Sequence, residues 1–346
     1  MILPIELCKG MTKSIYNAVE EIRSTGVKEL RGDHPISRHE VDAENAGLRY
    51  LTRESKKQPS LKMGLLYEQK TKGYLISDGN VREIEIEELK ELPDIAFLSD
   101  PIDGSKAEIA IYLSSCNKPM QIGETQDAFS TVIAFNPDRH TLKDAAACAL
   151  QRWDGWQFQA DENGSTASYN GEEAVITANR LDKIASKDTK FYTAAHYGHA
   201  LPMSTLVVEE ILRELKISEN DSPGVRSTGC TTADILKPTM TRSIAFDLRE
   251  PVDREMRKYG LKMKRGCHSW DVAPPGLLAK RAGAVLKDVY GNDIDCDLLA
   301  DDYSSYFAAP PGEAGEKVLK IIRDKVLPKI PEKVKSWKEF WDTEVK

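Results

Sequence analysis

The chain of 346 residues carries 48 lysines and arginines against 55 aspartates and glutamates, a formal net charge of −7, and 40% of it is hydrophobic. This length and apolar content suffice for one large domain or for two layers around a shared core. The negative charge excludes a nucleic-acid polymer as the expected partner, because recognition of a phosphate backbone usually shows as a basic excess. No apolar stretch approaches the roughly 18 residues that span a bilayer, so we expect no membrane partner.

The cysteines indicate a reducing compartment. They are scattered and contain no C-x-x-C pair: Cys8, Cys116, Cys148, Cys230, Cys267 and Cys296. Dispersed cysteines in a long chain are typical of a reduced, cytoplasmic protein. Glu6 and Lys9 interrupt the apolar start of the chain too early for a signal-peptide core. We therefore expect a cytoplasmic location.

The first half of the chain predicts two helices followed by a series of strands. Apolar residues at helical spacing indicate an amphipathic helix over 10–24 and a second helix over 40–53. Strands are expected at 62–66, 95–98, 129–135, 148–152 and 156–159, with a turn at Asn170-Gly171. The acidic segment 81–91 fits either a solvated hairpin arm or a helix.

The second half of the chain mixes strands and helices. Strands are expected at 191–193 and 244–248, helices at 204–215, 231–236 and 270–282, and a helical tail from Glu313. Antiparallel strands mixed with helices favour a layered α+β fold over strict βαβ repetition. We divide the chain into an N-terminal half (1–175), a C-terminal half (176–312) and a tail (313–346) that packs on the body or on a partner subunit.

The strongest chemical signal is the hexapeptide D-P-I-D-G-S at 100–105. Its two carboxylates follow an apolar strand, and Gly104 allows backbone to approach a ligand closely. Oxygen donors of this kind suit Mg²⁺. Asp-Pro and Asp-Gly pairs are also common in surface turns, so the hexapeptide alone leaves both interpretations open.

A second motif lies far downstream. Trp270-Asp271-Val272-Ala273 is followed by Leu277-Leu278 and then Ala282-Gly283-Ala284. Together the two motifs resemble the signatures of the inositol monophosphatase and fructose-1,6-bisphosphatase superfamily of Mg²⁺-dependent phosphomonoesterases. Weaker elements resemble other parts of that family in the same order: 37–40, 64–69, 162–171 and 229–233. The resemblance covers about residues 10–310, and two such motifs in order are specific.

The resemblance implies a layered αβαβα sugar-phosphatase fold with a mixed or antiparallel N-terminal sheet and a second C-terminal sheet. It also implies a site for two or three Mg²⁺ ions. The ligands would be the carboxylates of Glu68, Asp100, Asp103 and Asp271 and the backbone carbonyl of Ile102. Four carboxylates in one pocket raise each other's pKa unless cations are present. Two cations can clamp both the attacking and the leaving oxygen of an in-line displacement.

The same resemblance assigns catalytic roles to Glu40, Ser105 and Glu68, with the Ser105 hydroxyl and Glu40 orienting a water molecule. Substrate-binding roles fall to the amides of Gly104 and Ser105 and to Lys106 and Lys264. Lys106 resembles the branch that dephosphorylates 3′-phosphoadenosine nucleotides. Lys264 replaces an acidic residue of the inositol branch, and it suits a second phosphate or a solvated strand end.

The chain departs from the family pattern at three positions. Glu40 replaces an aspartate, Tyr67 replaces a glycine, and Gln69 replaces a glutamate that could serve a third metal. His196 and His199 fit loop hydrogen-bonding groups, with substrate contact as the alternative, and are not expected to bind metal. Cys230 and Cys267 are interpreted as packing residues.

The resemblance implies a phosphoric monoester hydrolase of carbohydrate metabolism that acts on fructose 1,6-bisphosphate, inositol monophosphate or both. The alternative is a 3′(2′),5′-bisphosphate nucleotidase, that is, a 3′-phosphoadenosine 5′-phosphate phosphatase. A non-catalytic phosphosugar-binding regulator is a weaker hypothesis, prompted by the three departures. The expected partner is a small phosphorylated molecule, and the family resemblance favours a homodimer or homotetramer.

Overall fold

The structure is a computed structural model that describes residues 3–25, 36–68, 70–103, 129–184, 189–193, 201–217, 223–261, 267–300 and 303–344. The chain forms two compact units. The first unit comprises Met1–Ile176, Ser269–Arg281 and Asp295–Asp301. The second comprises Thr177–His268, Ala282–Ile294 and Asp302–Lys346. Among the described helices none is long and apolar enough to cross a membrane.

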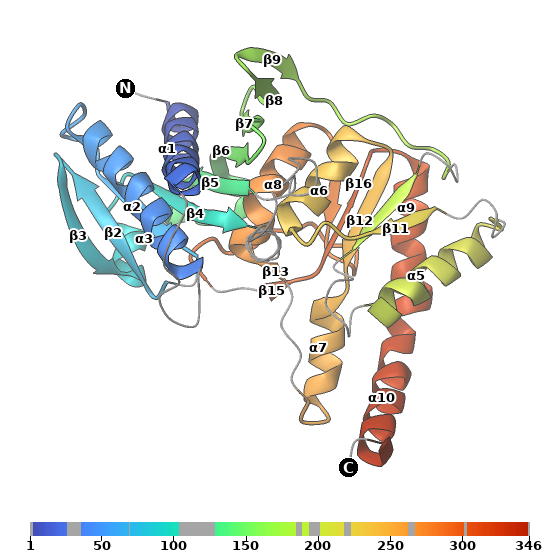
Figure 1. Ribbon diagram of the computed structural model, residues 1–346. Helices are drawn as coiled ribbons and strands as arrows, with labels where there is room; N and C mark the ends of the chain where they lie inside the picture. The colour runs from blue at the N-terminus through green and yellow to red at the C-terminus, as the bar shows by residue number, and fades with distance from the viewer. Residues whose placement is uncertain are drawn as a thin grey trace. The chain divides into compact units, whose positions relative to one another are not determined.

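The first unit is built on a nine-stranded sheet with the order β3-β2-β1-β4-β5-β6-β7-β8-β9. Its strands are β1 (Met63–Tyr67), β2 (Lys72–Ser77), β3 (Asn80–Glu85), β4 (Ile95–Asp103), β5 (Phe129–Phe135), β6 (Ala145–Arg152), β7 (Gln157–Asp161), β8 (Gly164–Tyr169) and β9 (Glu172–Val175). Only β1 and β4 pair in parallel, and the other neighbours are antiparallel. The β2–β3 and β8–β9 hairpins form the two ends of the sheet (Figure 1).

Helices cover both faces of this sheet. The helices α1 (Pro4–Thr25) and α2 (Ile36–Ser55) lie side by side over one face, where they bury a core with strand residues such as Leu65 and Ala149 (Figure 1). Side chains alternate along a strand, so Cys148 points to the opposite face. There its thiol lies near the backbone of Leu278 in α8 (Ser269–Arg281), which contacts β4 to β8.

The observed elements refine the sequence-based expectations. The first helix begins at Pro4, six residues before the predicted start at 10, with Leu7 and Cys8 in its buried face. The segment 81–91 contains both proposed structures, because β3 ends at Glu85 and α3 (Ile86–Glu91) begins there. A capping box between Glu85 and Glu88 satisfies backbone donors at this boundary.

The second unit contains a five-stranded sheet with the order β11-β10-β12-β16-β14. The strands are β10 (Lys190–Thr193), β11 (Gly224–Arg226), β12 (Ser243–Asp247), β14 (Val285–Lys287) and β16 (Tyr306–Ala309). A short pair, β13 (Cys267–His268) and β15 (Tyr303–Ser304), lies apart from it. The helix α6 (Thr231–Met240) contacts β12 and β16. The α+β class, with a mixed N-terminal sheet and a second C-terminal sheet, is thereby confirmed.

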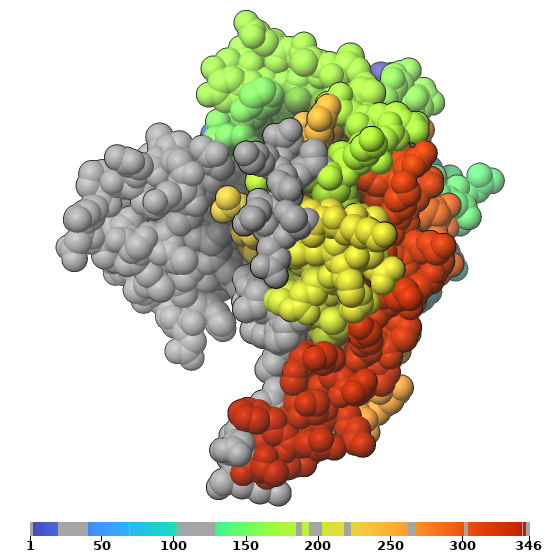
Figure 2. Space-filling model, turned by 90° about the vertical axis from the view of Figure 1, so that its right-hand side faces the viewer, coloured from blue at the N-terminus to red at the C-terminus, as the bar shows by residue number. Residues whose placement is uncertain are grey.

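The C-terminal tail packs on the second unit. It consists of α9 (Glu313–Ile321), a π-helical turn (Ile322–Val326), a 3₁₀ turn (Leu327–Lys329) and α10 (Ile330–Glu344). Val318, Ile322 and Val334 share one core with α5 (Leu201–Glu214) and with strand residues such as Phe246. Figure 2 shows α5 lying against the band formed by this tail.

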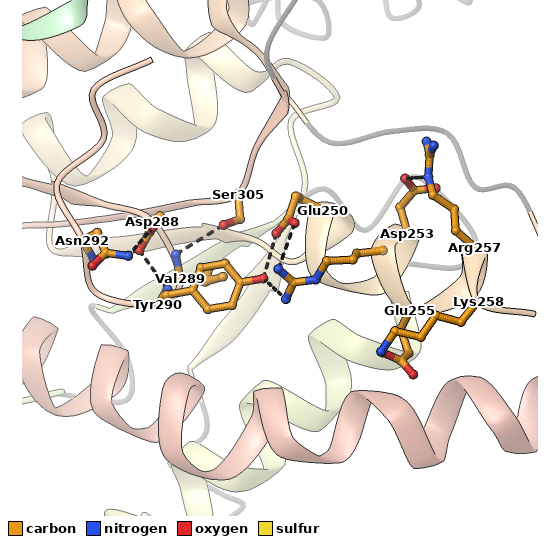
Figure 3. A network of polar contacts seen from close by, with 11 residues as sticks. Glu250, Asp253, Glu255, Arg257, Lys258, Asp288, Val289, Tyr290, Asn292 and Ser305 are labelled. Carbon is orange, nitrogen blue, oxygen red and sulfur yellow. Dashed lines mark hydrogen bonds and ion pairs between the residues drawn. The ribbon is translucent and has the colours of Figure 1, made fainter. Parts of the chain in front are cut away.

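A helix absent from the sequence-based expectations, α7 (Arg249–Arg257), follows β12. Its sequence is highly charged, and polar contacts fix it to the turn after β14. The hydroxyl of Tyr290 donates to Glu250 at 2.8 Å and accepts from Arg254 at 2.7 Å (Figure 3). In the same turn the Asp288 carboxylate accepts hydrogen bonds from the backbone N–H groups of Tyr290 and Asn292 (Figure 3).

Candidate metal centre

The site begins where the parallel pairing of β1 and β4 ends. Tyr67 in β1 pairs with Ser99 in β4, and the N–H of Glu68 donates to the carbonyl of Ser99 at 3.0 Å. Neighbouring parallel strands present their carboxyl ends at one edge of a sheet. Glu68 and Asp100 each directly follow a residue of the last parallel pair, so they lie side by side.

The third carboxylate comes from α8. Glu68, Asp100 and Asp271 each offer one oxygen, and these oxygens lie within 4.8 Å of one another. Asp100 is buried, whereas Glu68 and Asp271 are half-buried. Asp271 lies in the first turn of its helix, where the aligned peptide dipoles favour a negative charge. All three residues belong to the first unit.

The pairing of β4 with β5 is irregular between the two aspartates of the hexapeptide. The register between β4 and β5 shifts between Asp100 and Asp103, at the position of Pro101, which has no N–H for the ladder. The Ser130 hydroxyl donates to the carbonyl of Pro101 at 2.7 Å. Both Asp100 and Asp103 are buried, at 2% and 8% exposure, which argues against the surface-turn alternative.

The donor chemistry fits a hard cation such as Mg²⁺. The set consists of carboxylate oxygens only, and three carboxylates at this separation repel one another unless a cation or a proton offsets their charge. Thr131 faces Asp100 across β4 and β5, and its fully buried hydroxyl has no hydrogen-bond partner among the described residues. A buried hydroxyl beside the cluster is a further polar group for a bound cation or its water. The sequence-based hypotheses did not include Thr131, although a threonine in an apolar strand was a visible signal.

The structure brings some of the predicted site residues together, describes only the backbone of others, and does not describe the rest. Glu68, Asp100 and Asp271 come together, and Asp103 lies on the same strand as Asp100, three residues further on. The backbone of Ile102 belongs to β4, and Glu40 lies in α2, while the description does not extend to their side chains. The remaining predicted residues lie outside the described residues: Gly104, Ser105, Lys106, Lys264, Gln69, His196 and His199. The roles assigned to all these residues stay predictions.

The departure at Tyr67 has a structural explanation. The Tyr67 side chain is buried beneath α2, and its hydroxyl donates to the backbone carbonyl of Glu44. Gly47 makes room for it, because a Cβ at this position would lie 2.7 Å from the Tyr67 hydroxyl oxygen. Burial and the nearby Glu44 carboxylate raise the pKa of Tyr67 well above its usual value. The hydroxyl therefore stays protonated and able to donate.

The two cysteines interpreted as packing residues are both buried in the second unit. The Cys230 sulfur accepts a hydrogen bond from the N–H of Ala233 at the start of α6. The Cys267 thiol also belongs to a polar network, donating to Asp247 at 2.9 Å and accepting from Arg249 at 2.8 Å. Sequence patterns gave no signal for this network, because Cys267 lies 20 residues after Asp247 along the chain.

The two sheets with their helices are the fold of inositol monophosphatases and fructose-1,6-bisphosphatases, so the predicted resemblance is confirmed at the level of the fold. The structure is similar to fructose-1,6-bisphosphatase from Leishmania major in its apo form, at 12% identity and a TM-score of 0.62, over 92% of this chain and 93% of that chain. It is also similar to the extragenic suppressor protein suhB from Bartonella henselae, at 14% identity and a TM-score of 0.57, over 93% and 98%.

A third similar structure is SaIMPase-II with bound 2′AMP, an inositol monophosphatase of Staphylococcus aureus. Its identity is 9% and its TM-score 0.56, over 96% of this chain and 98% of that chain. No family model matches the sequence, and no curated protein matches it either.

Proposed function

We propose that this chain is a Mg²⁺-dependent phosphoric monoester hydrolase that acts on a small sugar or inositol phosphate. The observation that carries the proposal is the meeting of Glu68, Asp100 and Asp271, which come from three separate segments of the chain. Structures of the same fold include a fructose-1,6-bisphosphatase and an inositol monophosphatase. A phosphatase fold with an all-oxygen acidic cluster at one edge of its sheet supports metal-assisted hydrolysis.

In this proposal Glu68, Asp100 and Asp271 hold the cation, with Asp103 and the carbonyl of Ile102 completing a site for two or three ions. Bound Mg²⁺ would neutralise phosphate charge and make water a stronger acid. The Ser105 hydroxyl and Glu40 would orient the attacking water, and the Glu40 carboxylate would take its proton. As the water oxygen bonds to phosphorus, the phosphorus–oxygen ester bond would break, and the alcohol would leave with a proton from solvent. The amides of Gly104 and Ser105, with the side chains of Lys106 and Lys264, bind the phosphate groups.

The test is the release of inorganic phosphate from fructose 1,6-bisphosphate and inositol monophosphate, with Mg²⁺ and with a chelator. We expect hydrolysis that requires Mg²⁺ and is lost in Asp100→Asn, which removes one charge and keeps the shape. Glu91→Gln, an exposed residue of α3, makes the same charge change away from the cluster and serves as the control. Full activity of Asp100→Asn would contradict the proposed metal centre.

A bisphosphate nucleotidase is the second candidate. It is supported by the 2′AMP bound to SaIMPase-II, a nucleotide held by a protein of the same fold. The same assay with 3′-phosphoadenosine 5′-phosphate distinguishes the two candidates, because preferential hydrolysis of the nucleotide would favour the second. Binding of phosphosugars without hydrolysis of any panel member would instead indicate the non-catalytic regulator.

The proposal includes a homodimer or homotetramer, which light scattering coupled to size-exclusion chromatography measures directly. A mass of about 39 kDa in solution would contradict it, since the single chain has a mass of 38.7 kDa. The cytoplasmic location stays a prediction.

A further inference from the structure

The first turn of α8, which carries Asp271, receives less support from its own helix than an ordinary first turn. Pro274 and Pro275 follow within the helix, and proline has no N–H group. The carbonyls of Trp270 and Asp271 therefore cannot receive the usual helical hydrogen bond from the residue four positions further on. A metal ligand must be held firmly to bind well, so this turn needs support from outside the helix.

The Asp295–Asp301 segment supplies such support. The hydroxyl of Ser269, the first residue of α8, is fully buried and donates to the carbonyl of Ala300 at 3.1 Å. Ser269 lies two residues before Asp271. The segment and α8 belong to the same unit as Glu68 and Asp100, although the chain on either side of the segment belongs to the second unit.

The other end of the segment is anchored to the connection between β5 and β6. The backbone of Thr141 bridges that of Asp297, and the N–H of Leu298 donates to the carbonyl of His140 at 2.7 Å. The ring Nδ1 of His140 lies 2.8 Å from Oδ1 of Asp297. The same carboxylate oxygen accepts the N–H of Leu299 at 2.8 Å. Asp297 therefore fixes both the connection and the turn of its own segment.

Apolar contacts and an ion pair complete the anchor. Cys296, Leu298 and Leu299 are buried, with at most 5% of their surface exposed. The carboxylate of Asp295 accepts the N–H of Lys143 at 3.0 Å and pairs with its ammonium group at 3.3 Å. Residues 295–300 of the segment are thus held by contacts at both ends, and a shift at Ala300 would strain or break several of them.

We propose that His140, Asp297 and Ser269 are positioning residues for the metal ligand Asp271. His140 and Asp297 anchor the segment. The Ser269 hydroxyl binds the anchored segment and thereby fixes the first turn of α8, which its two prolines weaken. This inference rests on the proposed metal centre. It concerns how this chain holds one of its ligands, and none of the three residues is itself assigned as a ligand.

The test measures the affinity of the intact protein for Mg²⁺ and Mn²⁺ by calorimetry, without substrate. Residues that orient a metal ligand directly change metal affinity by about 10–100-fold, so we expect about 3–10-fold weaker binding for the more remote His140→Leu and for Ser269→Ala. His140→Asn keeps an N–H donor near the position of Nδ1, and we expect it to stay within about twofold of wild type.

Arg152→Leu is the matched control, because it breaks the half-buried ion pair with Asp154 in the same unit, away from the segment. It should lower the melting temperature and leave metal affinity unchanged. Ser269→Ala removes a single oxygen, so it decides the question if His140→Leu does not fold.

Two results would overturn the inference. Wild-type metal affinity in both His140→Leu and Ser269→Ala, together with loss of binding in Asp100→Asn, would refute the positioning role and leave the metal centre intact. Absence of Mg²⁺ and Mn²⁺ binding in the wild-type protein would refute both the metal centre and the inference.

Discussion

The hydroxyl of Tyr67 donates a hydrogen bond to the backbone carbonyl of Glu44 and thereby joins the end of β1 to α2. The same side chain stands one residue before Glu68, and Glu44 lies one helical turn after Glu40 in α2. An ion pair between Glu44 and Lys70, 3.2 Å long, adds a second tie between these elements. The two segments that carry proposed site residues are therefore fixed to each other by a buried hydrogen bond and a partly exposed ion pair.

Removing this hydroxyl should destabilise the protein. We expect Tyr67→Phe to lower the free energy of unfolding by about 1–2 kcal/mol, because a buried hydrogen bond is lost and the backbone carbonyl of Glu44 loses this donor. Urea unfolding monitored by circular dichroism measures the change. Tyr74→Phe is the control, since Tyr74 contacts Tyr67 edge-on at 6.5 Å between ring centroids and is only half-buried.

A double-mutant cycle tests the same contact from the other side. Gly47→Ala would place a Cβ 2.7 Å from the Tyr67 hydroxyl oxygen and 2.9 Å from Cε of Met11. Overpacking of this kind costs about 1–3 kcal/mol. We expect Gly47→Ala to be less harmful in the Tyr67→Phe background, where the closest atom is absent. Strict additivity of the two changes would show that Gly47 and Tyr67 are not coupled.

Repulsion within the acidic cluster should lower the stability of the metal-free protein, and metal binding should raise it. Asp271→Asn removes one of three carboxylates that lie within 4.8 Å of one another. We expect the metal-free variant to melt at or above the wild-type temperature, because like-charge repulsion falls. The rise in melting temperature on addition of Mg²⁺, present in the wild type by linkage, should disappear. Differential scanning calorimetry with and without Mg²⁺ decides, and an unchanged Mg²⁺-induced rise would contradict the ligand role.

The buried Asp247 should contribute an acid-sensitive part of the stability. Burial by itself raises the pKa of Asp247, but the Arg249 guanidinium and the hydrogen bonds from Arg249 and Cys267 outweigh it and hold this pKa below its usual value. The folded protein then binds fewer protons than the unfolded chain, so this contribution is complete above the ordinary aspartate pKa of about 4 and declines as the pH falls below it.

The variant Asp247→Asn tests this contribution. Because it leaves Arg249 buried without its charged partner, we expect a loss of about 3–5 kcal/mol at pH 7. The difference from wild type should shrink in urea unfolding as the pH falls below the ordinary aspartate pKa of about 4, as protonation removes the same charge from the wild type. The exposed pair of Asp324 with Arg323 provides the comparison, and Asp324→Asn should cause no measurable change. A pH-independent difference for Asp247→Asn would contradict the assignment.

The hydrogen-bond network around α7 should make a smaller contribution to stability. Burial and the hydrogen bond to Glu250 raise the pKa of Tyr290, so its hydroxyl stays protonated while it joins Glu250 to Arg254 (Figure 3). We expect Tyr290→Phe to reduce stability by about 1 kcal/mol. Tyr259→Phe, on the exposed turn after α7, should be neutral in the same thermal unfolding experiment.

The sequence by itself determined the features that depend on neighbours along the chain. Apolar spacing located the first helices, and the Asn170-Gly171 turn was predicted because both residues tolerate positive φ, observed at 51° and 85°. The hexapeptide at the end of β4 was recognisable because a strand, a proline and a glycine in that order aim carboxylates off a strand end. Patterns of this kind record local conformational preference, which acts over a few residues.

Tertiary structure decided what depends on contacts between distant segments. It placed α8 on the sheet of the first unit, so that Asp271 meets Glu68 and Asp100. It packed the Tyr67 hydroxyl against Gly47, where a side chain would collide with it. It also brought Ala300 to the start of α8, where its carbonyl accepts the Ser269 hydroxyl. Burial and hydrogen bonding between such segments are set by the packing of the whole chain, and the local pattern of residues does not encode them.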